Sequence, residues 1–180
     1  MATPAEHDPI EAGIARGEAL SRAGEDDEAV AHFAALVARH PEDARVAFAC
    51  AGALDSGGQE MEAAAEYRRA VDLGLPEDLL PQMYVQYGST LRNVGDRAGA
   101  VALLEQGTAA YPDDLAMACF LALARYSAGR ESTALAGLIE ALLRLDAGGT
   151  SLFQRYQRSL GAYAADLRDA EASPQGHPRT

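Results

Sequence analysis

The stretch YVQYGSTLRNVGDRAGA, residues 84–100, decides the fold of this chain. Its apolar residues recur at steps of three and four, the spacing that places side chains on one face of an α-helix; they are Tyr84, Tyr87, Leu91 and Val94. Gly95 follows, and glycine readily adopts the left-handed backbone with which many helices end. A second helix is predicted to begin at Asp96 or Arg97. The stretch therefore reads as one helix, a turn and the start of a helix that packs against it.

The same pattern recurs along the chain. The glycines at its turns, Gly24, Gly58, Gly95 and Gly129, stand 34, 37 and 34 residues apart. Each has an alanine five residues later, a large apolar residue nine residues later and a small residue seven residues earlier. In chain order these are Ala29, Ala63, Ala100 and Ala134; Phe33, Tyr67, Leu104 and Leu138; and Gly17, Ala51, Gly88 and Ala122. Agreement at every position in four units predicts an internal repeat of helix pairs.

This pattern resembles the tetratricopeptide repeat (TPR), whose period is about 34 residues. The resemblance covers roughly residues 8–146 and is strongest in the third unit, at Tyr84, Tyr87, Gly88, Leu91, Ala100, Leu104 and Pro112. The stretch from LGLPEDL through YGSTLRNVGD further resembles a small bacterial family of TPR proteins of largely unassigned function. The chain departs from the TPR pattern where Gly13, Ala47 and Ala118 replace its usual tryptophan, and where Asp146 replaces the last proline.

The resemblance implies an all-α, right-handed helical-repeat solenoid of four TPR-like helix pairs and a C-terminal capping helix. We expect one domain over residues 1–172, with repeats at about 8–41, 42–75, 76–112 and 113–146, a cap at about 151–170 and a disordered tail at 173–180. The cap carries an apolar stripe that could instead form a dimer interface: Leu152, Phe153, Tyr156, Leu160, Tyr163 and Leu167.

Prolines and acidic residues mark the predicted helix starts. Pro41, Pro76 and Pro112 are each followed by two acidic residues, which complement the positive end of a helix dipole. These prolines are therefore predicted to open helices. Pro81 lies inside the linker of residues 74–82 and predicts a kink or a separate first turn there.

Composition excludes several functions. A net charge of −12 and a pI near 4.6 argue against binding to nucleic acid or to an anionic membrane, both of which need a basic surface. All 15 basic residues are arginines. The first residues, MATPAEHDPIEAG, lack the basic and apolar regions of a signal peptide, and the sequence has no run of 18 apolar residues. We therefore expect a cytoplasmic protein.

The sequence offers little catalytic chemistry. The four histidines are scattered, and neither H-E-x-x-H nor C-x-x-C occurs. Ser89 lacks the flanking glycines of a nucleophile elbow, and no phosphate-binding glycine loop is present. We predict no enzyme, no metal site and no cofactor, and we interpret Cys50 and Cys119 as small core or groove residues.

The resemblance also implies where a ligand binds. In TPR arrays the first helix of each pair lines a concave groove, and those positions fall here on Ile14, Glu18, Arg45, Phe48, Asp55, Gln82, Val85, Ser89, Arg92, Asn93, Cys119, Leu123 and Tyr126. A few apolar anchors among polar groups suit an extended peptide or a partner helix. The clamp of chaperone-docking TPRs is not expected, because lysine is absent and Glu18 and Gly52 replace its asparagines.

The expected function is thus a non-catalytic protein–protein interaction module for an unidentified protein or peptide, present as a monomer or weak homodimer. Two alternatives remain open. The protein could be a structural one that self-assembles through its C-terminal helix, or the last helix could fold into the groove and fill it.

Overall fold

The computed structural model describes residues 8–145 and 152–172, the latter with side chains at 156–169 and 171. Its elements there are nine α-helices and one short 3₁₀ helix. Contacts divide the chain into two compact units, unit 1 (residues 1–94) and unit 2 (residues 95–180). The predicted tail at 173–180 and the predicted start of the cap at Ser151 lie outside the described residues.

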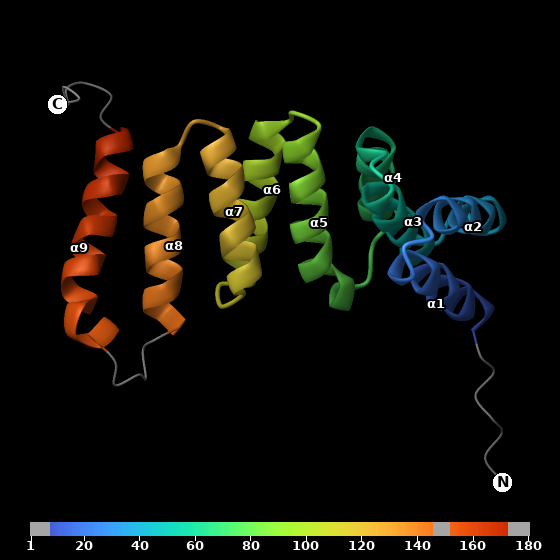
Figure 1. Ribbon diagram of the computed structural model, residues 1–180, viewed down its shortest axis with the longest axis horizontal. Helices are drawn as coiled ribbons and strands as arrows, with labels where there is room; N and C mark the ends of the chain where they lie inside the picture. The colour runs from blue at the N-terminus through green and yellow to red at the C-terminus, as the bar shows by residue number, and fades with distance from the viewer. Residues whose placement is uncertain (1–7, 146–151, 173–180) are drawn as a thin grey trace, which may run out of the picture. The chain divides into compact units, whose positions relative to one another are not determined.

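Unit 1 contains two helix pairs and one further helix. The first pair is α1 (Pro9–Arg22) and α2 (Asp26–Arg39), and the second is α3 (Ala44–Ser56) and α4 (Glu60–Asp72). The 3₁₀ turn η1 (Glu77–Leu79) leads into α5 (Leu80–Asn93). Helix α3 is central, because it contacts α1, α2, α4 and α5 (Figure 1).

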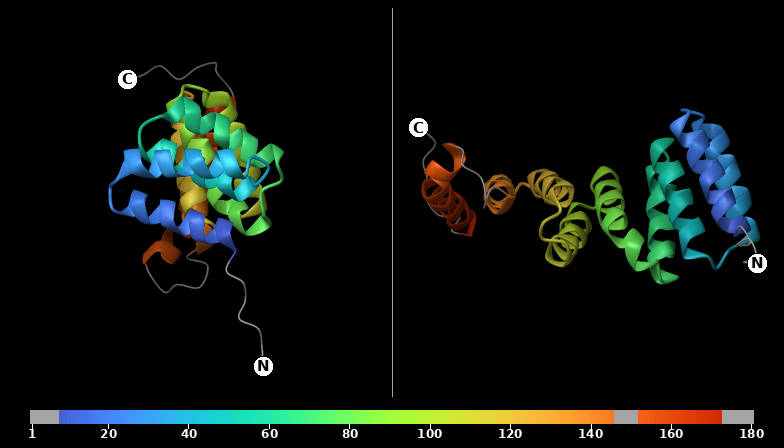
Figure 2. Two further views of the ribbon diagram at one scale, coloured as in Figure 1. Left: turned by 90° about the vertical axis from the view of Figure 1, so that its right-hand side faces the viewer. Right: turned by 90° about the horizontal axis from the view of Figure 1, so that it is seen from below.

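Unit 2 is a row of four helices. They are α6 (Arg97–Ala110), α7 (Leu115–Ser127), α8 (Glu131–Leu145) and α9 (Leu152–Ala172). Each packs on the next, so that α7 lies between α6 and α8, and α8 lies between α7 and α9 (Figure 2).

The predicted turn glycines end helices as the sequence indicates. Gly24, Gly58, Gly95 and Gly129 have φ angles of 76°, 74°, 92° and 76°, in the left-handed region. After three of them the next amide N–H donates to the carbonyl five residues back, as Glu25 does to Leu20 at 3.0 Å, which is the Schellman pattern. Gly74, with a φ of 86°, is a fifth such turn that the repeat register does not predict.

The repeat positions form the cores of the two units. The four alanines after the turns and the four small residues before them are all buried. Among the large apolar residues Phe33, Tyr67 and Leu104 are buried, whereas Leu138 is only half-buried. A Cβ on Gly17 would lie 2.3 Å from Phe33 Cζ, so the small residue on α1 makes room for the large one on α2.

Helix starts differ from the prediction at two prolines. Helices α3 and α7 begin three residues after Pro41 and Pro112, which lie in the preceding turns. The N-caps are Asp43 and Asp114, whose carboxylates accept hydrogen bonds from the amides of Arg45 and Met117, both at 2.9 Å. Pro81 sits in the first turn of α5, after the separate turn η1, as the linker predicts.

Candidate functional site

A cavity of about 610 Å³ opens in unit 1 between α1, α3 and the segment η1–α5. Helix α3 contacts both α1 and α5, so it forms the base of the cavity and the other two helices form its walls. Five of the predicted groove residues line it: Ile14, Glu18, Arg45, Phe48 and Gln82. Glu11, Asp78 and Gln86 also line it, although the sequence pattern did not single them out. Glu11 lies three residues before Ile14 and seven before Glu18, so helical spacing places it on the same face. This spacing could have identified Glu11 as a groove residue from the sequence.

The base of the cavity rests on aromatic rings in contact with one another, with Phe48 tilted by 57° against Tyr67. Phe48 is only 6% exposed, and its ring centroid lies 5.7 Å from that of Tyr67. Tyr67 stacks on Tyr87 of α5 with centroids 5.6 Å apart. The Tyr67 hydroxyl donates to Gln86 Oε1 at 3.1 Å, and burial raises its pKa well above the ordinary value. The rings therefore join α3, α4 and α5 into one support.

Arg45 is engaged by the protein itself. Its guanidinium contacts Asp43 Oδ2 at 2.8 Å and Asp8 Oδ2 at 3.2 Å, and these two carboxylates also cap α3 and α1. The hydrogen bond from Arg45 lowers the pKa of Asp43 below its ordinary value, and the hydrogen bond to Asp43 raises the pKa of Arg45. Arg45 thus links the N-termini of α1 and α3, and the two carboxylates already neutralise its charge.

The rim of the cavity is acidic. Glu11 and Glu18 on α1 and Asp78 on η1 line it, and none of the three takes part in an ion pair within the described part of the chain. Arg22 and Arg45 are the basic residues of the lining. The uncharged polar side chains of the lining are those of Ser21, Ser56, Gln82 and Gln86.

The remaining predicted residues of α5 lie off the cavity. Val85 and Ser89 are half-buried, and neither lines it. Arg92 Nη2 donates to Asn93 Oδ1 at 3.0 Å, and Asn93 Nδ2 donates to Glu60 Oε1 at 3.0 Å. These last residues therefore bind one another and α4. Asp55 is half-buried on α3, and burial raises its pKa.

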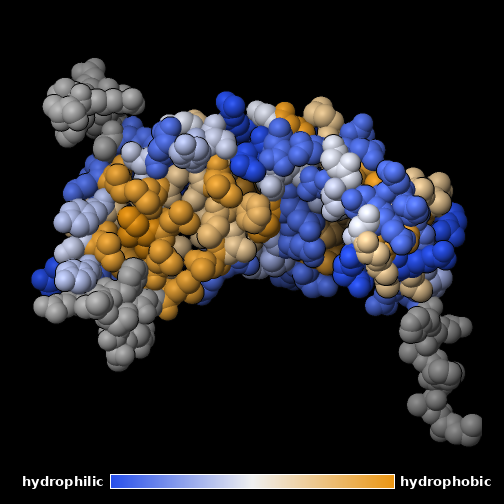
Figure 3. Space-filling view, in the orientation of Figure 1, coloured by the Kyte–Doolittle hydropathy of each residue, from blue (hydrophilic) through white to orange (hydrophobic). Residues whose placement is uncertain are grey.

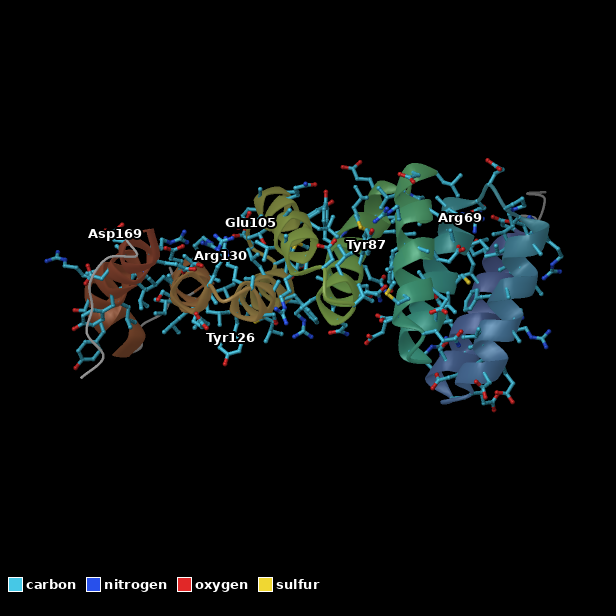
Figure 4. The ribbon with its side chains drawn as sticks, turned by 90° about the horizontal axis from the view of Figure 1, so that it is seen from above. Arg69, Tyr87, Glu105, Tyr126, Arg130 and Asp169 are labelled. Carbon is cyan, nitrogen blue, oxygen red and sulfur yellow. The ribbon has the colours of Figure 1, made fainter. Side chains whose placement is uncertain are left out.

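Leu123 and Tyr126 belong to unit 2, on α7, and are 47% and 65% exposed. Figure 4 shows Tyr126 pointing away from α7. Apolar side chains gather over α7 and α8 on the face shown in Figure 3. Exposed leucines on these two helices are Leu115, Leu123, Leu135, Leu142 and Leu145.

The two cysteines differ in exposure. Cys119 on α7 is exposed, whereas Cys50 is buried in α3. Burial raises the pKa of the Cys50 thiol to about 11.

Helix α9 packs against α8. Glu171 Oε2 accepts a hydrogen bond from the Thr133 amide, at 2.6 Å, near the start of α8, and Arg168 Nε donates to Glu140 Oε1 at 2.6 Å. The predicted stripe divides: Leu160 and Leu167 are half-buried, whereas Tyr156 and Tyr163 are 54% and 62% exposed. Leu152 and Phe153 lie outside the described side chains.

The described residues hold neither a metal-binding cluster nor a membrane-spanning helix. No group of three or more histidine, cysteine, aspartate or glutamate side chains there could hold a metal ion. No described helix combines the length and apolar character needed to cross a membrane.

Comparison with known proteins gives two family matches. The tetratrico peptide repeat family matches residues 44–167, more than half of the chain, and the bacterial transcriptional activator domain matches residues 2–81. No curated protein matches the sequence.

Solved structures of MamA share the fold. MamA 41-end from Desulfovibrio magneticus RS-1 has 15% sequence identity and a TM-score of 0.64 over 96% of this chain and 100% of that chain. Another crystal structure of MamA protein has 15% identity and a TM-score of 0.65 over 90% of this chain and 89% of that one. These similarities confirm the predicted fold class, an all-helical repeat.

Proposed function

We propose that this chain, which belongs to the tetratrico peptide repeat family, is a protein-interaction module that works without catalysis. In this proposal a peptide or helix of a partner protein lies in the cavity of unit 1. The observation that carries it is the cavity itself, about 610 Å³ in volume and bounded by α1, α3 and α5. Pockets that bind small molecules and cofactors span about 300–1,000 Å³, so this cavity is large enough to hold side chains of a peptide.

The lining supports a polypeptide ligand. Ile14, Phe48 and Leu79 supply apolar surface, and Gln82 and Gln86 supply amides that can bind a peptide backbone. The contacting rings of Phe48, Tyr67 and Tyr87 hold the base in place before a ligand arrives, which reduces the entropy lost on binding.

The chemistry of the described residues supports the absence of catalysis in this proposal. The buried groups with raised pKa values, Cys50 and Tyr67, stay protonated near neutral pH and are poor nucleophiles. The match of residues 2–81 to a bacterial transcriptional activator domain covers α1 to η1.

A substitution that fills the cavity with a larger side chain tests the proposal. Gly52 lies on α3 in the cavity lining, and the nearest atom to a Cβ built there is Tyr67 Oη at 4.0 Å. Position 52 therefore has room for a Cβ, and Gly52→Leu extends a side chain from the cavity lining. Leucine also favours helix by roughly 1 kcal/mol over glycine. Ala65→Leu, on the exposed face of α4, is the matched control.

We expect the wild type and Ala65→Leu to retain the same partner in affinity capture from the source lysate, and Gly52→Leu to lose it while its circular dichroism stays unchanged. Retention of that partner by Gly52→Leu would show that the cavity is not the binding site.

A second candidate function is self-assembly through the C-terminal helix. The observation that favours it is the exposure of Tyr156 and Tyr163 on α9, in the same unit that exposes leucines on α7 and α8. Monomeric proteins rarely expose contiguous apolar patches larger than a few hundred Å². Light scattering at several protein concentrations tests this candidate.

A further inference from the structure

We infer that the cavity of unit 1 selects a cationic segment, one whose arginine or lysine side chains are spaced among apolar ones. The inference rests on the proposed function and names the chemistry of its ligand. Its starting point is the rim, where Glu11, Glu18 and Asp78 have no ion-pair partner within the described residues.

The wall formed by α1 presents acidic and apolar groups in alternation. Glu11, Ile14 and Glu18 follow one another at steps of three and four residues, so they share one face of the helix, and all three line the cavity. The seven residues from Glu11 to Glu18 span about 10.5 Å along the helix axis. An extended peptide rises about 3.3 Å per residue and its side chains alternate between two faces. Cations two or four residues apart, about 6.6 or 13.2 Å, therefore share a face and bracket this spacing.

The arginines of the cavity do not cancel these carboxylates. Arg45 is held by Asp8 and Asp43 at 3.2 and 2.8 Å, and these two acids compensate its charge. The remaining charges of the lining are then one cation, Arg22, and three carboxylates, those of Glu11, Glu18 and Asp78. A ligand entering the cavity meets a net negative rim.

Most of the net charge of the chain belongs to unit 1, the unit that contains this cavity. Residues 1–94 carry 17 carboxylates and 7 arginines, a net charge of −10, whereas residues 95–180 carry 10 carboxylates and 8 arginines, a net charge of −2. A field of one sign raises the local concentration and the association rate of ligands of the opposite sign. It disfavours acidic peptides, and a neutral peptide would desolvate the rim carboxylates without pairing them.

The test selects peptides from a phage-displayed random 12-residue library on the full chain, and then measures one selected peptide by fluorescence anisotropy. The variant Glu11→Gln/Glu18→Gln removes two rim charges. Its control, Glu28→Gln/Glu62→Gln, removes two exposed charges from the first turns of α2 and α4, outside the cavity lining.

We expect selected peptides to be enriched in arginine and lysine. The rim variant should weaken binding about tenfold, as two partly exposed ion pairs would. The control should bind as the wild type does, and added salt should weaken the wild type more than the rim variant.

Other outcomes separate the inference from the function. Neutral or acidic selected peptides that Gly52→Leu no longer binds would overturn the cationic inference and leave the proposed function standing. Peptides that Gly52→Leu binds as well as the wild type would overturn both. Equal weakening in the rim variant and its control would overturn the assignment of selectivity to this cavity.

Discussion

Three helical glycines of unit 1 show how differently one residue type can be used. A Cβ on Gly17 would lie 2.3 and 2.4 Å from two atoms of the buried Phe33 ring. On Gly13 it would lie 3.0 Å from the flexible end of Leu36, and on Gly52 it would meet nothing closer than 4.0 Å. The need for glycine is therefore strict at Gly17, weak at Gly13 and absent from the packing around Gly52.

Alanine substitution at these positions should give opposite signs. Gly17→Ala should lower the free energy of unfolding by about 1–3 kcal/mol, because it overpacks α1 against α2. Gly52→Ala should raise it by roughly 0.5–1 kcal/mol, because alanine favours helix and the site has room. Urea unfolding followed by circular dichroism measures both. Equal effects at the two positions would contradict the close approach of α1 to Phe33.

At this scale the sequence predicts packing better than binding. The pairing of Gly17 with Phe33 follows from the repeat register, because both positions recur in every unit. The role of Arg45 does not follow, because one of its partners, Asp8, lies 37 residues away and meets it only when α1 packs on α3. A residue expected to face a ligand thus binds the protein's own helix caps.

At the scale of the helix, the starts of α1 and α3 depend on one electrostatic cluster. Asp8 caps α1, Asp43 caps α3, and Arg45 contacts both carboxylates. Backbone hydrogen bonding lowers the pKa of Asp8, and the Arg45 side chain lowers that of Asp43, both below 3.8. A carboxyl whose pKa is lowered by folding stabilises the protein above its unfolded value, and that stability is lost as the pH falls through the folded value.

Two variants separate the cap from the ion pair. Asp43→Ala should lower the free energy of unfolding at pH 7 by about 1–2 kcal/mol, because it removes both. Arg45→Met keeps the cap and should cost only about 0.2–1 kcal/mol. Both differences from the wild type should shrink as the pH falls below 3.8 and through the lowered pKa of Asp43, where its carboxylate becomes protonated in the folded protein. Urea titrations at several pH values measure this, and a pH-independent loss in Arg45→Met would argue against the ion pair.

Helix boundaries show where local sequence signals compete. Pro41 and Asp43 are both good starts for a helix, as the first residue and the N-cap respectively. The structure begins α3 after Asp43, whose carboxylate accepts bonds from two amides of the first turn, at 2.9 and 3.3 Å. Nothing in the local pattern decides between these starts. The turn before Pro81 was predictable, because an interior proline removes a helical hydrogen bond.

At the scale of the whole molecule, the division into units was not visible in the sequence. It falls between Val94 and Gly95, inside the third predicted repeat, where the repeat pattern continues without a break. The repeat register depends on local spacing, whereas a division between units depends on contacts over long distances. The expectation of one domain over residues 1–172 therefore stays a prediction.

Self-association is the property of the whole molecule to measure. We expect the mass from light scattering to rise with protein concentration if α9 is an interface, because Tyr156 and Tyr163 would bury apolar surface there. Tyr156→Ser/Tyr163→Ser should then return the chain to its monomeric mass. Met61→Ser/Val71→Ser, which removes two exposed apolar residues of α4, should not. A monomeric mass of the wild type at every concentration would rule out assembly through α9.

The hydrogen bond between Glu171 and the Thr133 amide sets an order of events during synthesis. The N-terminus of α8 receives this partner from a residue 38 positions later in the chain. Until Glu171 has been made, the amide of Thr133 must rely on water, and the last helix cannot hold α8 in this way. The described caps of α1 and α3 come from Asp8 and Asp43, which are made before unit 1 is complete. We therefore expect unit 1 to fold on the ribosome before unit 2, which lacks this hydrogen bond until the last turn of α9 has been made.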